Sequence, residues 1–356
     1  MKLGLFTMPL HPPEVPKHEG FQRDIDLLIR ADRLGLSEAW IGEHYASAWE
    51  SVPAPDLLIA RALGETSQIK FGTGVACLPH HNPIELAHRI AYLDHLARGR
   101  LLFGIGPGGL MVDHELFCID TEHDEQRQLT EAVIDAVLDV WTGPSSGEWQ
   151  TDRWHFKVPQ TTSFGLGLHL RPYQQPHPPI GVAGVSPGSG SLGLASERGW
   201  IPLSLNFLTP AGLADHGRVI DEGALRAGRD ADRSVWRVCR DIHVAQTTKQ
   251  AIAEARDGAM GRAFREYVLP LVRSTGRVSV FKASPDMPDD DVDVDYLVEN
   301  IWIVGDPPTV TAKLQRLYDE IGGFGTLIQL CYDWEPVETG ARSMELLANE
   351  VLPKLP

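Results

Sequence analysis

A short apolar segment of the chain ends in side chains that could exchange protons. Residues 39–41 are Ala, Trp and Ile, and Gly42 separates them from Glu43, His44 and Tyr45. In parallel α/β proteins, catalytic groups gather where the strands end, because that edge is left open. An imidazole titrates near neutral pH and can act as a general acid or base. The segment predicts a strand that ends in a proton-transfer site, although an ordinary polar loop explains the same residues equally well.

A glycine-rich segment follows another apolar stretch. Residues 104–109 read Gly-Ile-Gly-Pro-Gly-Gly and formally match the GxGxxG pattern of dinucleotide-binding folds. That pattern requires a helix to start at the glycines, whereas a polar segment from Asp113 to Gln128 follows here. We therefore favour glycines that let a ligand plane or a neighbouring backbone approach closely.

A second turn of small residues spans 185–190, with the sequence Val-Ser-Pro-Gly-Ser-Gly. Backbone N–H groups and hydroxyls at the start of a helix can bind a phosphate. A position late in a barrel is also where phosphate sites are common. Serines that cap a helix give the alternative interpretation, which on this segment alone is the more common one.

The histidine and aspartate clusters do not predict a metal site. His80 and His81 are adjacent, but no ligand spacing of the HExxH kind is present. The aspartates between 291 and 295 resemble the start of a calcium loop, yet Tyr296 and Trp302 stand where that loop needs Gly and Glu. We expect a solvated acidic loop there and no bound metal.

Composition narrows the classes of partner. The 356 residues carry a formal net charge of -16, which disfavours nucleic acids and anionic membranes. The four cysteines are far apart and form no CxxC pair, so neither a disulfide framework nor a zinc ribbon is indicated. No stretch approaches the roughly 20 apolar residues that span a bilayer, and no signal peptide is evident. We expect a cytoplasmic protein that binds a small molecule.

Strand-like and helix-like segments alternate along the chain. Apolar strands are predicted at residues 2–6, 39–41, 70–77, 101–105, 180–183, 201–205, 235–244 and 325–330. Helical periodicity follows each of the first seven, with the clearest helix start at residues 82–85, Asn-Pro-Ile-Glu.

Eight apolar strands without two-residue alternation favour parallel strands that are buried on both faces. The sequence therefore predicts a TIM (β/α)8 barrel rather than an open sheet. Residues 1–356 are expected to form a single domain with long rim-loop insertions at 107–125, 143–178 and 273–298.

With these motifs in order, the chain resembles the bacterial luciferase-like flavin monooxygenases. The similar segments are residues 2–6, 43–44, 71–74, 78–79, 82–83, 99–106, 176–180 and 305–307. Within that family it is most similar to the diketocamphane monooxygenases, at residues 41–44, 49–53, 57–60, 195–199 and 322–327.

The resemblance implies a two-component, Baeyer-Villiger type monooxygenase. It implies that reduced FMN (FMNH2) binds at the carboxyl-terminal rim and is supplied by a separate NAD(P)H-dependent flavin reductase. It further implies that O2 forms a flavin C4a-peroxide, which oxygenates a small apolar substrate such as a ketone or a terpenoid-like compound. A homodimer is the family's usual assembly.

The resemblance also assigns residues. His44 falls on the catalytic histidine, and Glu43 beside it is a candidate to orient it or to balance its charge. The resemblance places the flavin against Thr73, Gly74, Val75 and Gly106, where some members hold a non-proline cis peptide. The phosphate-binding turn falls on Gly184, Val185 and Ser186. Apolar and aromatic walls of the substrate pocket are expected from Tyr45, Trp49, Leu205 and Phe207.

One departure and two alternatives remain. Luciferases carry a cysteine and an arginine where this chain has Gly106 and Pro107. Without that arginine the phosphate lacks a bidentate charged partner and must rely on backbone and hydroxyl groups. The same resemblance allows a non-catalytic flavin-binding partner subunit, or a deazaflavin (F420)-dependent oxidoreductase with the same barrel.

Overall fold

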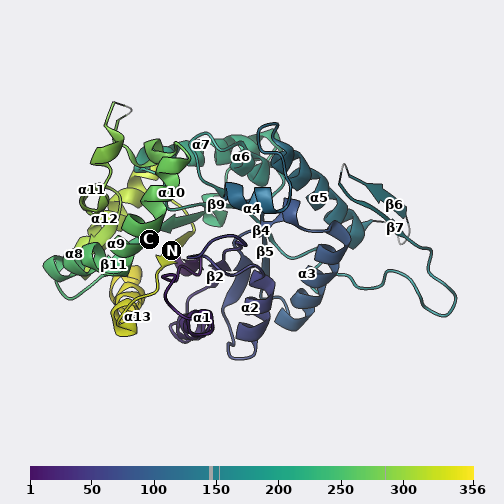
Figure 1. Cartoon of the computed structure of the whole chain (residues 1–356), viewed down its shortest axis with the longest axis horizontal. Coiled ribbons are helices and arrows are strands. Elements are labelled where there is room, and N and C mark those ends of the chain that lie inside the picture. The colour runs from purple at the N-terminus through teal and green to yellow at the C-terminus, as the bar shows by residue number, and fades with distance from the viewer. Residues whose placement is uncertain (144–146, 152, 285) are drawn as a thin grey trace.

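A closed barrel of parallel strands forms the centre of the computed structural model, which describes residues 1–143, 147–151, 153–284 and 286–356 (Figure 1). Its hydrogen-bonded order is β3-β2-β1-β13-β10-β9-β8-β5, and pairing of β3 with β5 closes it. The strands are β1 (Lys2–Thr7), β2 (Glu38–Ile41), β3 (Lys70–Thr73), β5 (Leu101–Gly106), β8 (Ile180–Gly184), β9 (Ile201–Ser204), β10 (Arg237–Arg240) and β13 (Thr326–Cys331). The predicted (β/α)8 barrel and all eight of its strands are confirmed.

Helices cover the outside of the barrel (Figure 1). They include α1 (Lys17–Arg33), α2 (Pro55–Leu63), α3 (Pro83–Ala97), α5 (Glu125–Thr142), α6 (Gly190–Glu197), α7 (Pro210–Arg226) and α12 (Pro307–Ile321). The helical stretch predicted at 251–272 is divided into α8 (Thr248–Asp257), α9 (Ala259–Ala263), a π-helical turn (Phe264–Val268) and α10 (Leu269–Ser274). Among the described residues, no helix is long and apolar enough to cross a membrane.

Side-chain caps fix where several helices begin. The Asn82 side chain accepts a hydrogen bond from the backbone N–H of Ile84 at 3.0 Å, as the sequence predicts for the start of α3. Asp306 caps α12 in the same way through the N–H of Thr309, at 3.0 Å. Gly322 ends α12 with φ of 79°, a conformation that favours glycine.

The rim insertions contain elements that the periodicity did not predict. β6 (Gly147–Gln150) and β7 (His155–Val158) form an antiparallel hairpin that projects at the right of Figure 1. Two further short helices are α4 (Met111–Leu116) and α11 (Val294–Asn300), and α13 (Val337–Leu346) follows the last strand.

The predicted strand at 235–244 is split into β10 and β11 (Ile242–Val244), and β11 pairs with an additional strand, β12 (Ile303–Gly305). Short 3-10 or π-helical turns lie at 78–80, 233–235, 278–281, 289–291, 347–351 and 352–354.

Trp40 of β2 fills the barrel interior, and glycines on neighbouring strands make room for it. A Cβ atom at Gly72 or Gly181 would lie 2.4 or 2.6 Å from the indole ring. A Cβ at Gly104 would lie 1.8 Å from the carbonyl oxygen of Thr73. The glycine-rich segment therefore starts inside β5 with Gly104, which allows close approach of the neighbouring backbone and confirms the interpretation favoured over a dinucleotide motif.

Candidate active site

The carboxyl end of β2 delivers Glu43 and His44 to the rim of the barrel. Gly42 donates its N–H to the carbonyl of Thr7 on β1 at 2.9 Å, which extends the strand pairing by one residue. The N–H of His44 donates to the carbonyl of Val52 at 3.0 Å, so the loop after the strand folds back on itself. Both side chains are buried. The two backbone hydrogen bonds fix the position of the His44 backbone, from which the imidazole extends.

The His44 imidazole lies between two carboxylates. Its Nδ1 donates to Oδ2 of Asp113 at 2.9 Å, and its Nε2 lies 3.8 Å from Oε2 of Glu50. Asp113 is fixed in turn, because its Oδ1 accepts the backbone N–H groups of Tyr45 at 3.1 Å and Ala46 at 2.7 Å. One carboxylate oxygen of Asp113 therefore holds the imidazole, while the other is held by the backbone, so Asp113 fixes the orientation of the His44 ring.

This arrangement changes how His44 titrates. Burial alone would lower the pKa of His44, but the Glu50 and Asp113 carboxylates outweigh it and raise the pKa above its usual value. Burial opposes ionisation of Asp113 too, yet the hydrogen bonds from His44 and the backbone leave its pKa lowered. His44 therefore retains a proton at higher pH than a free imidazole does.

A second layer of hydrogen bonds surrounds Glu50. Burial raises the pKa of Glu50, and the hydroxyl of Tyr267 donates a hydrogen bond to its Oε2. Ser47 Oγ donates to the Tyr267 hydroxyl at 3.0 Å and accepts the N–H of Glu50 at 3.0 Å. The Tyr267 ring stacks on Trp49 with centroids 5.8 Å apart.

Sequence reasoning missed three residues of this network: Asp113, Glu50 and Tyr267. Glu50 lies inside the 49–53 segment that carried the resemblance, so that motif was the one available signal for it. Asp113 and Tyr267 stand 69 and 220 residues from the residues they bond, His44 and Ser47. No local spacing pattern connects positions that far apart.

Glu43 is hydrogen-bonded to His81. The Nε2 of His81 donates to its two carboxylate oxygens at 2.9 and 3.1 Å. Cys77 Sγ lies 3.8 Å from its backbone carbonyl. The nitrogens of His44 are held by Asp113 and Glu50, so Glu43 acts on His44 only through its charge.

The predicted flavin-contact residues lie beside this network. Thr73 Oγ1 donates to the carbonyl of Gly104 at 2.7 Å, and the N–H of Gly74 donates to that of Ile41 at 2.6 Å. The peptide bond between Gly74 and Val75 is cis, and it separates β3 from β4 (Ala76–Cys77). Gly106 faces Val75, whose Cγ2 would lie 2.7 Å from an added Cβ. A small hollow inside the barrel, too narrow to admit a water molecule, is lined by Phe6, Trp40, Gly74, Val75, Gly104, Gly181, Val182, Ala183 and Leu203.

The second glycine-rich turn follows directly from that hollow. Gly184 ends β8, Val185 is exposed, and the Ser186 carbonyl accepts a hydrogen bond from His216 Nε2 at 2.7 Å. The turn leads into α6, whose first residue is Gly190. The N–H of Gly188 donates to the Asp215 carboxylate, so one candidate phosphate donor has an internal partner.

The four predicted substrate-wall residues occupy separate surroundings. Tyr45 is half-buried, and its ring packs edge-on against the rings of His80 and Phe117, with centroids 5.7 and 4.8 Å away. Leu205 packs against the apolar cluster at the barrel centre, whereas Phe207 packs in the neighbouring cluster. Trp49 lines a cavity of about 390 Å³ that is formed mainly by the loop after β1, the loop after β13 and α9.

Comparison with known proteins places this geometry in a family. A family model described as luciferase-like monooxygenase matches residues 1–323. The chain belongs to this family.

Named relatives cover essentially the whole chain. It is 33% identical to limonene 1,2-monooxygenase of Rhodococcus erythropolis, across 98% of this chain and 85% of that protein. It is 30% identical to 3,6-diketocamphane 1,6-monooxygenase of Pseudomonas putida, across 100% and 98%. The solved structure of the oxygenating constituent of 3,6-diketocamphane monooxygenase in complex with FMN superposes with a TM-score of 0.93, at 30% identity, covering 100% of this chain and 99% of that one. The resemblance drawn from the sequence is confirmed.

Proposed function

We propose that the chain is the oxygenase component of a two-component system that uses reduced FMN and O2 to add one oxygen atom to a small apolar ketone or terpenoid-like compound. The observation that carries the proposal is His44, held by the Asp113 carboxylate just beyond the carboxyl end of β2, next to the end of β3 at Thr73. The full-length likeness to an FMN-bound diketocamphane monooxygenase supports it.

The residues at the mouth fit FMN. Glycines stand directly after β3, at position 74, and at the end of β5, at position 106, and strand ends without side chains suit a planar ring system. Thr73, Gly74, Val75 and Gly106 would hold the ring, and a side chain at Gly106 would collide with Val75. The turn at 184–186 and the start of α6 would offer backbone N–H groups to the phosphate. Reduced FMN would supply the electrons that activate O2.

The protein's own contribution is to place a proton and to exclude water. Asp113 fixes the ring of His44 and favours its protonated form, so the Nε2 atom can donate a proton during oxygen transfer. Glu50 lies on the Nε2 side, where it can return a proton after each cycle. Tyr45 beside His80 and Trp49 beside Tyr267 would keep bulk water away from the reacting atoms.

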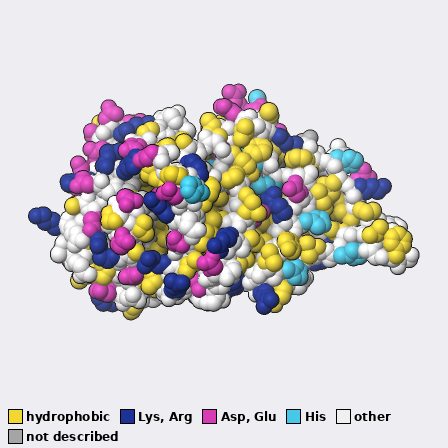
Figure 2. Space-filling view, turned by 60° about the horizontal axis from the view of Figure 1, so that its bottom comes forward, with side chains coloured by type: hydrophobic (Ala, Val, Ile, Leu, Met, Phe, Trp, Pro, Cys, Tyr) yellow, Lys and Arg dark blue, Asp and Glu magenta, His cyan; other side chains and the backbone are white. Residues whose placement is uncertain are grey.

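The proposed partners are an NAD(P)H-dependent flavin reductase, which supplies FMNH2, and a second copy of this chain. Figure 2 shows hydrophobic side chains gathered over the middle and right of one face, with charged side chains denser on its left. Exposed apolar side chains on α2, α3 and α4 are Leu57, Tyr92, Leu96, Met111, Val112 and Leu116. Such a surface supports homodimer formation. We further propose that residues 1–356 act as one domain.

Anaerobic titration tests the cofactor and the chemistry together. The chain is titrated with FMNH2 or with a reduced deazaflavin, and an O2 pulse is then given with a panel of ketones and monoterpenes. We expect tighter binding of FMNH2 and an oxygenated product from at least one compound. Preference for the deazaflavin, or flavin binding without any product, would replace the proposal with one of the two alternatives.

A further inference from the structure

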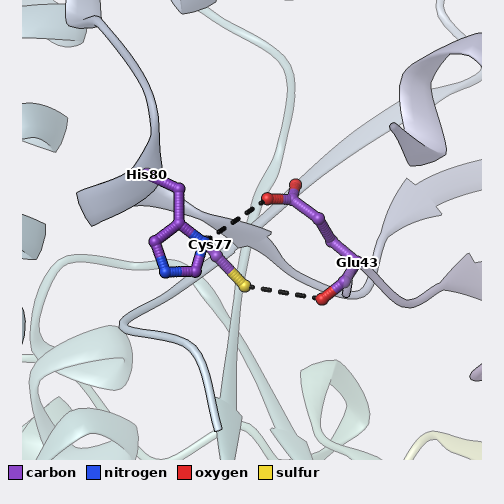
Figure 3. A group of neighbouring side chains, drawn as sticks. All are labelled: Glu43, Cys77 and His80. Atoms are coloured by element: carbon purple, nitrogen blue, oxygen red, sulfur yellow. Dashed lines mark hydrogen bonds and ion pairs between the residues drawn. The ribbon is translucent and has the colours of Figure 1, made fainter. Parts of the chain in front are cut away.

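We propose that Glu43, Cys77 and His80 form a binding site for one divalent cation of the Zn²⁺ class. Glu43 follows β2, Cys77 ends β4, and His80 ends the 3-10 turn that comes next. The His80 ring faces the Glu43 carboxylate, and Cys77 Sγ faces the Glu43 backbone carbonyl (Figure 3). One ligand atom from each lies within 4.8 Å of the others, and all three residues are buried. The inference rests on this geometry and does not depend on the proposed oxygenase activity.

The distances suit a tetrahedral ion after a small movement. The Nδ1 atom of His80 lies 4.0 Å from Oε1 of Glu43. Ligand atoms bound to Zn²⁺ at about 2.0–2.3 Å stand roughly 3.5 Å apart around a tetrahedron. Side-chain rotations that bring the atoms closer by about 1 Å would complete three of the four positions, with water in the fourth.

His80 supplies an independent sign of a missing ligand. Its Nδ1 atom is buried without a hydrogen-bond partner. The other ring nitrogen, Nε2, lies 3.3 Å from Nδ1 of His114, and the ring stacks on Phe117 with centroids 4.4 Å apart. These contacts hold the unpaired nitrogen toward Glu43. A buried polar atom without a partner is costly, and coordination to a cation would satisfy it.

The charges and the surroundings also suit a dication. The Glu43 carboxylate and a Cys77 thiolate would together neutralise it, while the thiol proton passes to solvent on binding. His81 donates to both Glu43 oxygens, so it can stay on one of them while the other binds the metal. Metal ligands are commonly oriented by such outer hydrogen bonds. A nitrogen, sulfur and oxygen ligand set favours Zn²⁺ or Co²⁺ over Ca²⁺ or Mg²⁺.

Cobalt titration of the metal-free chain tests the site. We expect one Co²⁺ per chain, a thiolate-to-cobalt charge-transfer band, and loss of that band on addition of Zn²⁺. Cys77→Ser should abolish the band. His80→Phe keeps the ring that stacks on Phe117 but removes the ligand nitrogen, and should weaken Co²⁺ binding at least about tenfold. Cys118→Ser is the matched control, because Cys118 is an exposed thiol outside the cluster.

The thermal unfolding midpoint of the same samples reports whether each variant folds and whether the metal stabilises it. Zn²⁺ should raise the midpoint of the wild-type chain and of Cys118→Ser, but not that of Cys77→Ser. If Cys77→Ser does not fold, His80→Phe decides the question by the same two measurements. Absence of a band in the wild-type chain would overturn the proposal. So would a band that survives in Cys77→Ser and disappears in Cys118→Ser.

Discussion

Asp113 holds the Nδ1 atom of His44, and its charge sets how readily that imidazole keeps a proton. Asp113→Asn removes the charge while leaving a side chain of the same shape. The carboxylates raise the pKa of His44, so the substitution lowers it. Activity that needs protonated His44 should then begin to decline at lower pH, so the alkaline limb of the kcat profile moves to lower pH.

The control for this prediction is Asp135→Asn, an exposed carboxylate on α5 that pairs with Arg198. It should leave the limb where it is. An alkaline limb that Asp113→Asn does not shift would show that Asp113 does not tune His44.

The sequence could predict His44 but not the groups that control it. His44 ends an apolar strand, and that signal is local. Its carboxylate partners depend on how the loops at 45–52 and 107–113 fold over the rim, which no spacing pattern encodes. Phe207 illustrates the same limit: it follows β9 as expected, but its side chain turns toward Phe281 in another cluster.

At the scale of elements, two glycines differ in the space around them: Gly104 lies in β5, and Gly109 lies in the turn after it. A methyl group on Gly104 would lie 1.8 Å from the backbone oxygen of Thr73, whereas one on Gly109 would meet nothing within 4 Å. We expect Gly104→Ala to lower the free energy of unfolding by about 3 kcal/mol, because the backbone of two strands must separate. Gly109→Ala should change it by less than about 0.5 kcal/mol.

Urea denaturation of both variants measures the difference. Equal effects of the two substitutions would contradict the view that Gly104 is needed for strand packing.

The eight barrel strands could be predicted because most of them contain a short apolar run, although β10 reads Arg-Val-Cys-Arg. Shorter elements could not. α4 has six residues and β12 has three, too few to show a period. The predicted strand at 70–77 is divided into β3, which ends at Thr73, and β4, which begins at Ala76.

For the whole molecule, closure of the barrel brings its first and last units together. β1 pairs with both β2 and β13, and the loops beyond them meet at His11. The imidazole of His11 donates to Asp24 of α1 at 3.1 Å and to Asp333 after β13 at 2.8 Å. Burial disfavours its charge, but the two carboxylates outweigh burial and raise the pKa of His11 to about 9.

This contact predicts how stability depends on pH. The pKa of His11 is higher in the folded chain than in the unfolded chain. The stabilisation that protonated His11 gives to the fold is therefore fully present below the unfolded pKa of about 6.5, and it is lost as pH rises through the folded pKa of about 9. The loss is on the order of 3 kcal/mol. Urea denaturation across this range should show a steeper decline for the wild-type chain than for His11→Gln. His18→Gln, which replaces an exposed histidine at the start of α1, should follow the wild type.

The central claim is that His44 couples the oxidation of reduced FMN to oxygen transfer. The most direct measurement is turnover under ¹⁸O2 with a flavin reductase, in which labelled product and H2O2 are counted for the wild-type chain and for His44→Ala. We predict that His44→Ala still binds FMN but yields at least about 100-fold less labelled product, with H2O2 in its place. An unchanged ratio of labelled product to H2O2 would contradict the account.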